Sequence, residues 1–221
     1  MSEKTTCHAH LLGPQQINAI FDKLSERIIP KCELNYSSAF ELLIAVVLSA
    51  QTTDESVNRV TPALWEKCHT PQDYIDLGED GISDCIRSIG LYRNKAKSLV
   101  GLCKMLIDKY DGCVPSSREE LMSLPGVGRK TANVVLNVWF KQPTMAVDTH
   151  VFRVANRLGI VSADTPEAVE LALMERVPKK YLLNAHHYLL LHGRYTCTAK
   201  KPQCETCSVA KWCSSANQFS S

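Results

Sequence analysis

Ten cysteines are spread unevenly along the 221-residue chain, and four of them lie close together near its C-terminal end. These four are Cys197, Cys204, Cys207 and Cys213, with the spacing C-x6-C-x2-C-x5-C. Four neighbouring thiolates can hold either a tetrahedral zinc ion or a [4Fe–4S] cluster. Zinc modules usually combine two close ligand pairs, whereas this segment has one Cys-x2-Cys pair. The spacing therefore indicates a metal centre and modestly favours iron–sulfur over zinc.

The second segment that could do chemistry is Leu-Pro-Gly-Val-Gly-Arg-Lys-Thr-Ala, residues 124–132. Apolar spacing predicts one helix before it and another after it. Gly126, Val127 and Gly128 would form a tight turn, because glycine adopts torsions that other residues resist. The N–H groups of such a turn lie at the start of the next helix, where the helix dipole favours a phosphate. The segment resembles a helix–hairpin–helix element, which binds the DNA backbone without reading its sequence.

Lys130 follows this turn, and its amine has two interpretations: a further phosphate-binding lysine or a nucleophile. An amine must be neutral to attack, and both the positive end of a helix and the neighbouring Arg129 cation favour the neutral form. Asp148, 18 residues further on (148 − 130), is expected to be the N-cap of a helix over residues 151–158. A helix start also holds a carboxylate firmly, so capping and catalysis are compatible at this position.

Composition places these segments in an ordinary globular protein. The chain is 45% hydrophobic and 22% charged, and it has no run of about 18 uncharged apolar residues, so we expect no membrane span. Residues 1–14 lack the pattern of an export signal and are expected to be a poorly structured leader. The expected compartment is therefore reducing, which favours metal binding over disulfides for the four clustered cysteines.

The net charge of +2 is divided unequally along the chain. Residues 1–120 contain 13 Lys and Arg against 17 Asp and Glu, a net charge of −4, and residues 121–221 contain 12 against 6, a net charge of +6. The positive surplus favours an anionic partner for the second part of the chain.

Helical spacing runs through almost the whole sequence and predicts an all-α fold. Residues 40–48 are apolar on nearly every side, as expected of a buried central helix. Between Gly90 and Gly112 the sequence predicts a basic helix, which carries Arg93, Lys95, Lys97 and Lys104. No flexible linker marks a boundary between two consecutive domains. Helix starts are indicated by capping boxes at Ser38 and Ser116, each with Glu three residues later, and by Thr70-Pro71 and Thr165-Pro166.

Several segments together carry a resemblance to a known family. Residues 124–136, with Lys130, and residues 146–153, with Asp148, resemble the endonuclease III family. Further matches are Phe-Glu-Leu-Leu-Ile-Ala-Val-Val-Leu-Ser-Ala-Gln-Thr-Thr-Asp at 40–54, Ile-Gly-Leu-Tyr at 89–92 and His-Gly-Arg-Tyr-Thr-Cys at 192–197. The resemblance extends over residues 17–213 in the family's order.

The resemblance implies two all-helical domains with a DNA-binding groove between them. One would be a six-helix domain at residues 32–142, with the helix–hairpin–helix element at about residues 118–137. The other would be discontinuous, joining residues 1–31 to residues 143–221 and holding a [4Fe–4S] cluster. This arrangement would explain why no linker is seen.

The resemblance also implies a bifunctional DNA glycosylase and AP lyase of base excision repair. Such an enzyme would remove oxidised pyrimidines from duplex DNA and cleave the strand 3′ to the abasic site by β-elimination. Lys130 would attack the sugar C1′ after the damaged nucleotide is flipped out, and Asp148 would stabilise the charge developing on the sugar. The expected partner is duplex DNA with damaged bases or abasic sites, and the protein is expected to be a cytoplasmic monomer at the nucleoid.

Other positions that match the family receive supporting roles. Gln51 and Leu91 would fill the space that the flipped nucleotide leaves, although a solvent-exposed helix end and a core leucine are the simpler interpretations. His150 would contact the DNA backbone or only pack, and Lys201 would contact a phosphate. The four clustered cysteines would bind the iron.

Two other functions fit parts of the sequence. A monofunctional mismatch glycosylase of the adenine-specific type would lack a lysine at position 130. A non-catalytic DNA-binding module with structural zinc would explain the hairpin and the cysteines, but it would show neither lyase activity nor iron–sulfur absorbance.

Overall fold

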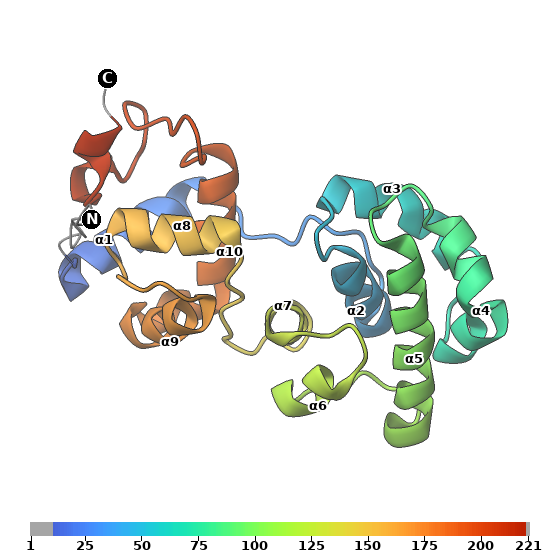
Figure 1. Ribbon diagram of the computed structural model, residues 1–221. Helices are drawn as coiled ribbons and strands as arrows, with labels where there is room; N and C mark the ends of the chain where they lie inside the picture. Colours follow the sequence, from blue (N-terminus) through green and yellow to red (C-terminus); the bar gives the residue numbers. More distant parts are fainter. Residues whose placement is uncertain (1–10, 220–221) are drawn as a thin grey trace, which may run out of the picture. The chain divides into compact units, whose positions relative to one another are not determined.

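The computed structural model describes residues 11–219, and the ordered elements of this part of the chain are helical throughout (Figure 1). The predicted all-α fold is therefore confirmed. No helix in the described range combines the length and the apolar composition that crossing a membrane requires. The elements are α1 (Pro14–Arg27), α2 (Ala39–Leu48), α3 (Asp54–Trp65), α4 (Pro71–Cys85), α5 (Tyr92–Tyr110), α6 (Arg118–Ser123), α7 (Arg129–Val138), α8 (Thr149–Leu158), α9 (Pro166–Arg176), α10 (Lys179–Tyr195) and the short 3-10 helices η1 (Ala210–Trp212) and η2 (Ala216–Gln218).

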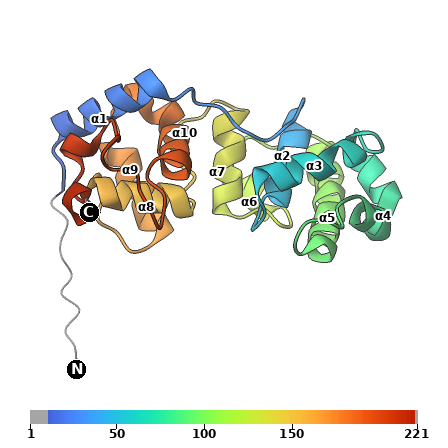
Figure 2. The same cartoon turned by 90° about the horizontal axis from the view of Figure 1, so that it is seen from above.

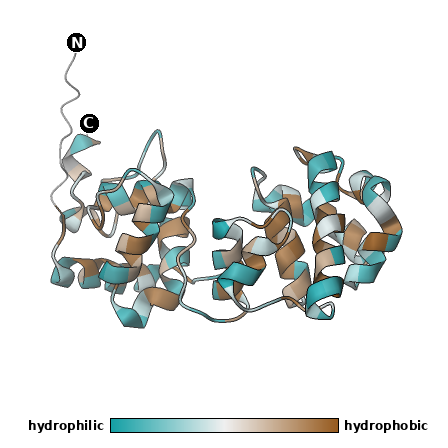
Figure 3. Ribbon diagram, turned by 60° about the horizontal axis from the view of Figure 1, so that its bottom comes forward, coloured by the Kyte–Doolittle hydropathy of each residue, from teal (hydrophilic) through white to brown (hydrophobic). Residues whose placement is uncertain are grey.

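The chain folds as two compact units. The central unit is Cys32–Gln142 and contains α2 to α7. The terminal unit joins Met1–Lys31 to Pro143–Ser221, so that α1 packs with α10 from the other end of the chain. Figure 3 shows hydrophobic and hydrophilic residues alternating along the helices of both units, as expected when each helix buries one face.

The central unit is built around α2. Residues 42–45 of this helix are fully buried, which confirms the central helix that the all-round apolar sequence predicts. α3, α5 and α7 pack against α2, and α4 lies along α5 (Figure 2). The turn after α6 and the start of α7 are therefore carried by a well-packed set of helices.

The terminal unit has its own apolar core, formed by α1, α8, α9 and α10. Leu12 is buried in this core, and its N–H donates to the carbonyl oxygen of Gly159 at 2.9 Å. Arg176 donates to the carbonyl oxygen of Leu12. The expectation of a poorly structured leader over residues 1–14 is thus wrong for its last residues, because Leu12 contributes apolar surface to the core. Residues 1–10 lie outside the described part.

Most of the predicted helix starts are confirmed. The Thr70 and Thr165 hydroxyls accept the N–H groups of Asp73 and Ala168. The Ser38 hydroxyl accepts the Glu41 N–H at 3.1 Å, but the Glu41 carboxylate accepts from Ser37 instead of closing the capping box on Ser38.

The predicted cap at Ser116 is wrong by one residue. Ser117 is the N-cap of α6, and its hydroxyl accepts the Glu120 N–H at 3.3 Å. Both serines precede a glutamate by three residues, so the sequence pattern does not distinguish them.

Candidate functional site

The predicted helix–hairpin–helix element is present, with α6 and α7 joined by residues 124–128. The Val127 N–H donates to the Leu124 carbonyl oxygen at 3.1 Å, which closes the turn. Gly126 has φ +80°, in the left-handed region that glycine tolerates. A Cβ at Gly126 would also lie 3.0 Å from Ser98 Cβ. The hairpin therefore packs closely against α5, which carries Ser98.

The second glycine has a different role from the one expected. Gly128 has φ −92°, which any residue can adopt, and a Cβ there would meet no atom within 4 Å. The lack of a side chain at Gly128 is therefore not needed for the packing of the protein, and would matter only for a ligand that approaches this turn from solvent. Val127 points the other way, because its side chain is 6% exposed and packs inside the unit.

Lys130 is the second residue of α7, and its side chain is exposed. The rest of α7 is anchored, because residues 132–138 are all buried. The long amine therefore extends from the N-terminal end of a fixed helix, directly after a hairpin suited to bind a phosphate.

Gln51 and Leu91 are both exposed and both have left-handed backbone, with φ of 54° and 58°. Gln51 lies between α2 and α3, and Leu91 stands at the N-cap of α5. Left-handed torsions are unfavourable for residues with a Cβ by about 1–2 kcal/mol each. Neither residue is packed in the core, so the simple interpretation of Leu91 as a core leucine is wrong.

Asp148 is the N-cap of α8, as predicted, although this helix begins at Thr149 instead of Val151. Its Oδ1 accepts the N–H groups of His150 at 2.9 Å and Val151 at 2.8 Å. The segment before it is also held, because His186 Nδ1 lies 2.8 Å from the Ala146 carbonyl oxygen. The half-buried carboxylate is therefore fixed on a rigid backbone.

Two arginines on α8 connect this helix to the first cysteine. Arg153 donates to the carbonyl oxygens of Gly193 at 2.8 Å and Cys197 at 3.0 Å, and it also contacts His150 Nδ1 at 3.2 Å. Arg157 donates to the carbonyl oxygens of residues 198 and 199 at 2.8 and 2.9 Å. The helix that begins at Asp148 thus also holds the segment around Cys197.

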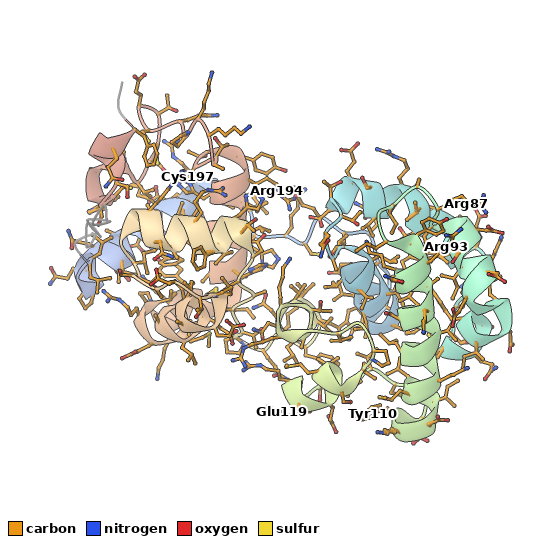
Figure 4. The ribbon with its side chains drawn as sticks, in the orientation of Figure 1. Arg87, Arg93, Tyr110, Glu119, Arg194 and Cys197 are labelled. Atoms are coloured by element: carbon orange, nitrogen blue, oxygen red, sulfur yellow. The ribbon has the colours of Figure 1, made fainter. Side chains whose placement is uncertain are left out.

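The four clustered cysteines line one pocket of about 300 Å³, a volume that includes its opening to solvent. Cys197 lies where the chain leaves α10 (Figure 4). Within residues 11–219, no group of three or more His, Cys, Asp or Glu side chains is arranged to hold a metal ion. Four soft thiols around a shared space are the ligand type that an iron–sulfur cluster takes.

The four cysteines of the pocket are half-buried. Burial raises the pKa of the Cys207 and Cys213 thiols, which must lose their protons to bind iron. His192 lies beside them, with Nε2 3.8 Å from Cys207 Sγ, and burial lowers its pKa to about 4, so the ring is neutral at physiological pH.

The loop between Cys197 and Cys204 is braced from within. The Thr198 hydroxyl donates to the Lys201 carbonyl oxygen at 2.6 Å, and the Gln203 N–H donates to the Thr196 carbonyl oxygen at 3.0 Å. Lys200 and Lys201 are exposed on it. Restrained backbone therefore presents these two positive charges to solvent.

The structure brings some predicted residues together and leaves others apart. The cysteines share one pocket, and Asp148 and His150 share the first turn of α8. Lys130 belongs to the central unit and Asp148 to the terminal unit. Sequence reasoning missed Arg153 and Arg157, whose partners are backbone oxygens about forty residues away in the chain.

Comparison with known proteins is consistent with this architecture. A model of the HhH-GPD superfamily base excision DNA repair proteins matches residues 44–179, and one of the iron–sulfur binding domain of endonuclease III matches residues 197–213. Endonuclease III of Rickettsia conorii is 52% identical over 200 residues, which are 90% of this chain and 95% of the relative. Endonuclease III of Escherichia coli K12 is 50% identical over 184 residues, 83% of this chain and 87% of the relative.

Among solved structures, a trapped endonuclease III–DNA covalent intermediate is similar to this chain. It is 50% identical, with a TM-score of 0.90, and the match covers 94% of this chain and 99% of the other. The hairpin, the all-α fold and the cysteine pocket thus define a helix–hairpin–helix protein of base excision DNA repair. The chain belongs to the endonuclease III family. It binds damaged duplex DNA, holds a [4Fe–4S] cluster and acts as a DNA N-glycosylase and AP lyase.

Proposed function

We propose that Lys130 is the nucleophile with which this enzyme removes oxidised pyrimidines and cleaves the strand, and that Asp148 is its electrostatic partner. The observation that carries the proposal is the position of Lys130 on α7. The amine is exposed at the second residue of a buried helix, directly after the turn at Gly126. A hairpin that grips a phosphate would place a deoxyribose within reach of this side chain.

The chemistry follows from an amine meeting a flipped nucleotide. Lys130 Nζ forms a bond to C1′ while the glycosidic bond breaks, and the base leaves with the bonding electrons and takes up a proton. The sugar ring opens to an imine between Nζ and C1′. Loss of a proton from C2′ then expels the 3′ phosphate, which cleaves the strand. Water finally hydrolyses the imine and frees the amine.

Asp148 supplies a fixed negative charge to this sequence. Its two backbone hydrogen bonds hold the carboxylate in place, so no reorganisation is needed as the sugar becomes positive. The [4Fe–4S] cluster, when bound by its four cysteines, supplies a cross-link that stiffens the loop at Lys201. The residues that act on the substrate are those of the protein.

The remaining residues would bind DNA around the reacting nucleotide. Gln51 and Leu91 would fill the vacated space, and the hairpin N–H groups of Gly126, Val127 and Gly128 would hold the backbone. His150 and Lys201 would contact phosphates. In this proposal Cys32–Gln142 is the hairpin domain and the terminal unit is the cluster domain, and a monomer acts on the cytoplasmic nucleoid.

A panel of duplexes that each contain one defined lesion tests this function. Base release and strand cleavage are measured separately on oxidised pyrimidines, alkylated purines and mismatches. We expect both products from oxidised pyrimidines. Base release without cleavage would show a monofunctional glycosylase and would rule out Lys130 as the nucleophile.

A further inference from the structure

Lys95 is a buried cation without an anionic partner. The residue is 6% exposed, and burial lowers the pKa of its amine. Nζ donates to the Leu48 carbonyl oxygen at 2.8 Å and to the Thr52 hydroxyl at 2.5 Å, and no carboxylate in the described residues forms an ion pair with it. An apolar side chain of the same length would avoid the desolvation of a charge at this position. The two hydrogen bonds are therefore the distinctive contribution of this lysine.

Those hydrogen bonds connect two loops that are distant in sequence. Leu48 is the last residue of α2, where a helix leaves carbonyl oxygens without partners, and Thr52 directly follows Gln51. The backbone N–H of Lys95 also donates to the Leu91 carbonyl oxygen at 3.0 Å. This main-chain bond belongs to the first turn of α5 and does not depend on the lysine side chain. The side chain supplies the connection from this turn, directly after Leu91, to the residues on either side of Gln51.

Both linked residues have strained backbone. Gln51 and Leu91 are the exposed left-handed residues described above, and such torsions persist only where the surroundings fix them. The loop of Gln51 has local hydrogen bonds of its own, among them the Thr52 N–H donating to the Ser49 carbonyl oxygen at 3.1 Å and the Ala50 N–H donating to the Val47 carbonyl oxygen at 3.3 Å, and Lys95 adds a connection to α5. Arg87, which precedes α5, and Arg93, in its first turn, are both exposed (Figure 4). Lys95 is buried instead.

We propose that Lys95 is a positioning residue that locks Gln51 and Leu91 into one rigid pair for insertion into the duplex. The inference rests on the proposed role of Gln51 and Leu91 in filling the space of the flipped nucleotide. Without the lysine, each loop would have to be ordered separately when DNA binds, which slows insertion and the base excision that depends on it.

The experiment measures insertion directly. A duplex with a non-cleavable lesion analogue and an adjacent 2-aminopurine reports unstacking by fluorescence in stopped flow. Lys95→Met keeps the side-chain length but removes the donors, and Lys97→Met makes the same change at an exposed neighbour on α5. We expect Lys95→Met to slow insertion and single-turnover base excision by at least about tenfold. The affinity of Lys95→Met for undamaged duplex should change by less than about twofold. The control Lys97→Met should show the wild-type rate of insertion.

Two further measurements separate positioning from general stability. Lys95→Met leaves the buried Leu48 carbonyl oxygen without its donor and should lower the Tm, so insertion is measured well below the Tm of the variant, where the protein is fully folded. Thr52→Val should slow insertion by itself and add nothing to Lys95→Met, because both remove the same contact. Thr52→Val also provides the test if Lys95→Met does not fold.

The outcomes distinguish this inference from the function on which it rests. If Gln51→Ala or Leu91→Ala slows insertion while Lys95→Met and Thr52→Val insert at the wild-type rate, positioning by Lys95 is wrong and the role of the pair stands. If neither Gln51→Ala nor Leu91→Ala changes insertion, the role of the pair fails, and the role of Lys95 fails with it.

Discussion

At the scale of single residues, Asp148 combines structural and electrostatic roles in one carboxylate. Oδ1 caps α8 through two backbone N–H groups, and the negative charge remains for the reacting sugar. An N-cap aspartate differs from an N-cap asparagine chiefly in charge, because both side chains offer an oxygen to the same N–H groups. The two roles can therefore be separated by substitution.

We expect Asp148→Asn to fold normally and to lower the rate of base excision by about 10²–10³-fold, as expected when a preorganised charge is removed from a transition state. Lyase action on a preformed abasic site should fall less, because no base is expelled there. Single-turnover assays on both substrates measure the difference. Asp148→Ala is the control for the cap and should lose about 1 kcal/mol of stability in addition. Equal losses in both assays would contradict the role of the charge.

Cys103 gives a pH dependence with a definite sign. Burial raises the pKa of this thiol to about 12, whereas an unfolded cysteine titrates near about 8.5. Above that pH the unfolded chain loses the proton and the folded protein keeps it, so the stability contributed by the neutral thiol is lost as pH rises. Cys103→Ala removes this group. The wild-type Tm should therefore fall more than the variant Tm between pH 8 and 10.5, and parallel curves would contradict the assignment.

Lys95, Arg153 and Arg157 show which residues sequence reasoning can find. Lys95 shares the helical spacing of the buried Leu99 and Leu102, so its inward position was present in the sequence but was obscured by the surrounding basic residues. The two arginines gave no such signal, because backbone oxygens of a distant loop are their partners. Local periodicity predicts the face that is buried, and only the fold shows what a long side chain reaches.

At the scale of elements, the fold of the hairpin requires glycine at only one of its two glycine positions. Gly126 needs left-handed torsions and lies against α5, while Gly128 needs neither. The sequence predicted the hairpin because two glycines at this spacing imply a tight turn. It could not assign the reason for each one, since torsion and contact depend on the packed helices.

We predict opposite effects for alanine at these two positions. Gly126→Ala should destabilise the protein by at least about 1–2 kcal/mol, through the positive φ and the contact with Ser98. Gly128→Ala should leave stability unchanged within about 0.5 kcal/mol and weaken DNA binding, because its methyl group projects where a phosphate would approach. Chemical denaturation and duplex affinity measure the two effects. Unchanged affinity in a folded Gly128→Ala protein would show that the hairpin does not approach the DNA closely.

Helix boundaries show the same limit of sequence reasoning. Thr70 and Thr165 were predicted correctly because each stands alone before a proline. Ser116 and Ser117 both fit the capping pattern, and the structure selects the second. Where two neighbouring residues fit the capping pattern equally well, the packing of the helix that follows determines which one is the N-cap. In α6 the fully buried Leu121 provides this packing.

At the scale of the whole molecule, the cluster loop is expected to contribute affinity without selectivity. Lys201 stands on a braced loop, and phosphate contacts are independent of sequence. Lys201→Ala should weaken binding to damaged and undamaged duplexes equally and reduce the slope of log K against log salt by about 0.9. Titrations at several salt concentrations measure it, with Lys104→Ala as a control for exposed charge on α5. A loss confined to one lesion would show that this loop reads the damage.

Lys130 is central to the proposed mechanism, because both reactions are assigned to its amine. Borohydride reduces an imine to a stable bond, so wild-type enzyme incubated with a duplex containing an oxidised pyrimidine should yield a covalent protein–DNA adduct. Lys130→Gln should abolish this adduct while duplex binding remains measurable, and Lys104→Gln, the same change at an exposed residue of α5, should leave the yield unchanged. An undiminished adduct in Lys130→Gln would place the nucleophile elsewhere and contradict the proposed mechanism.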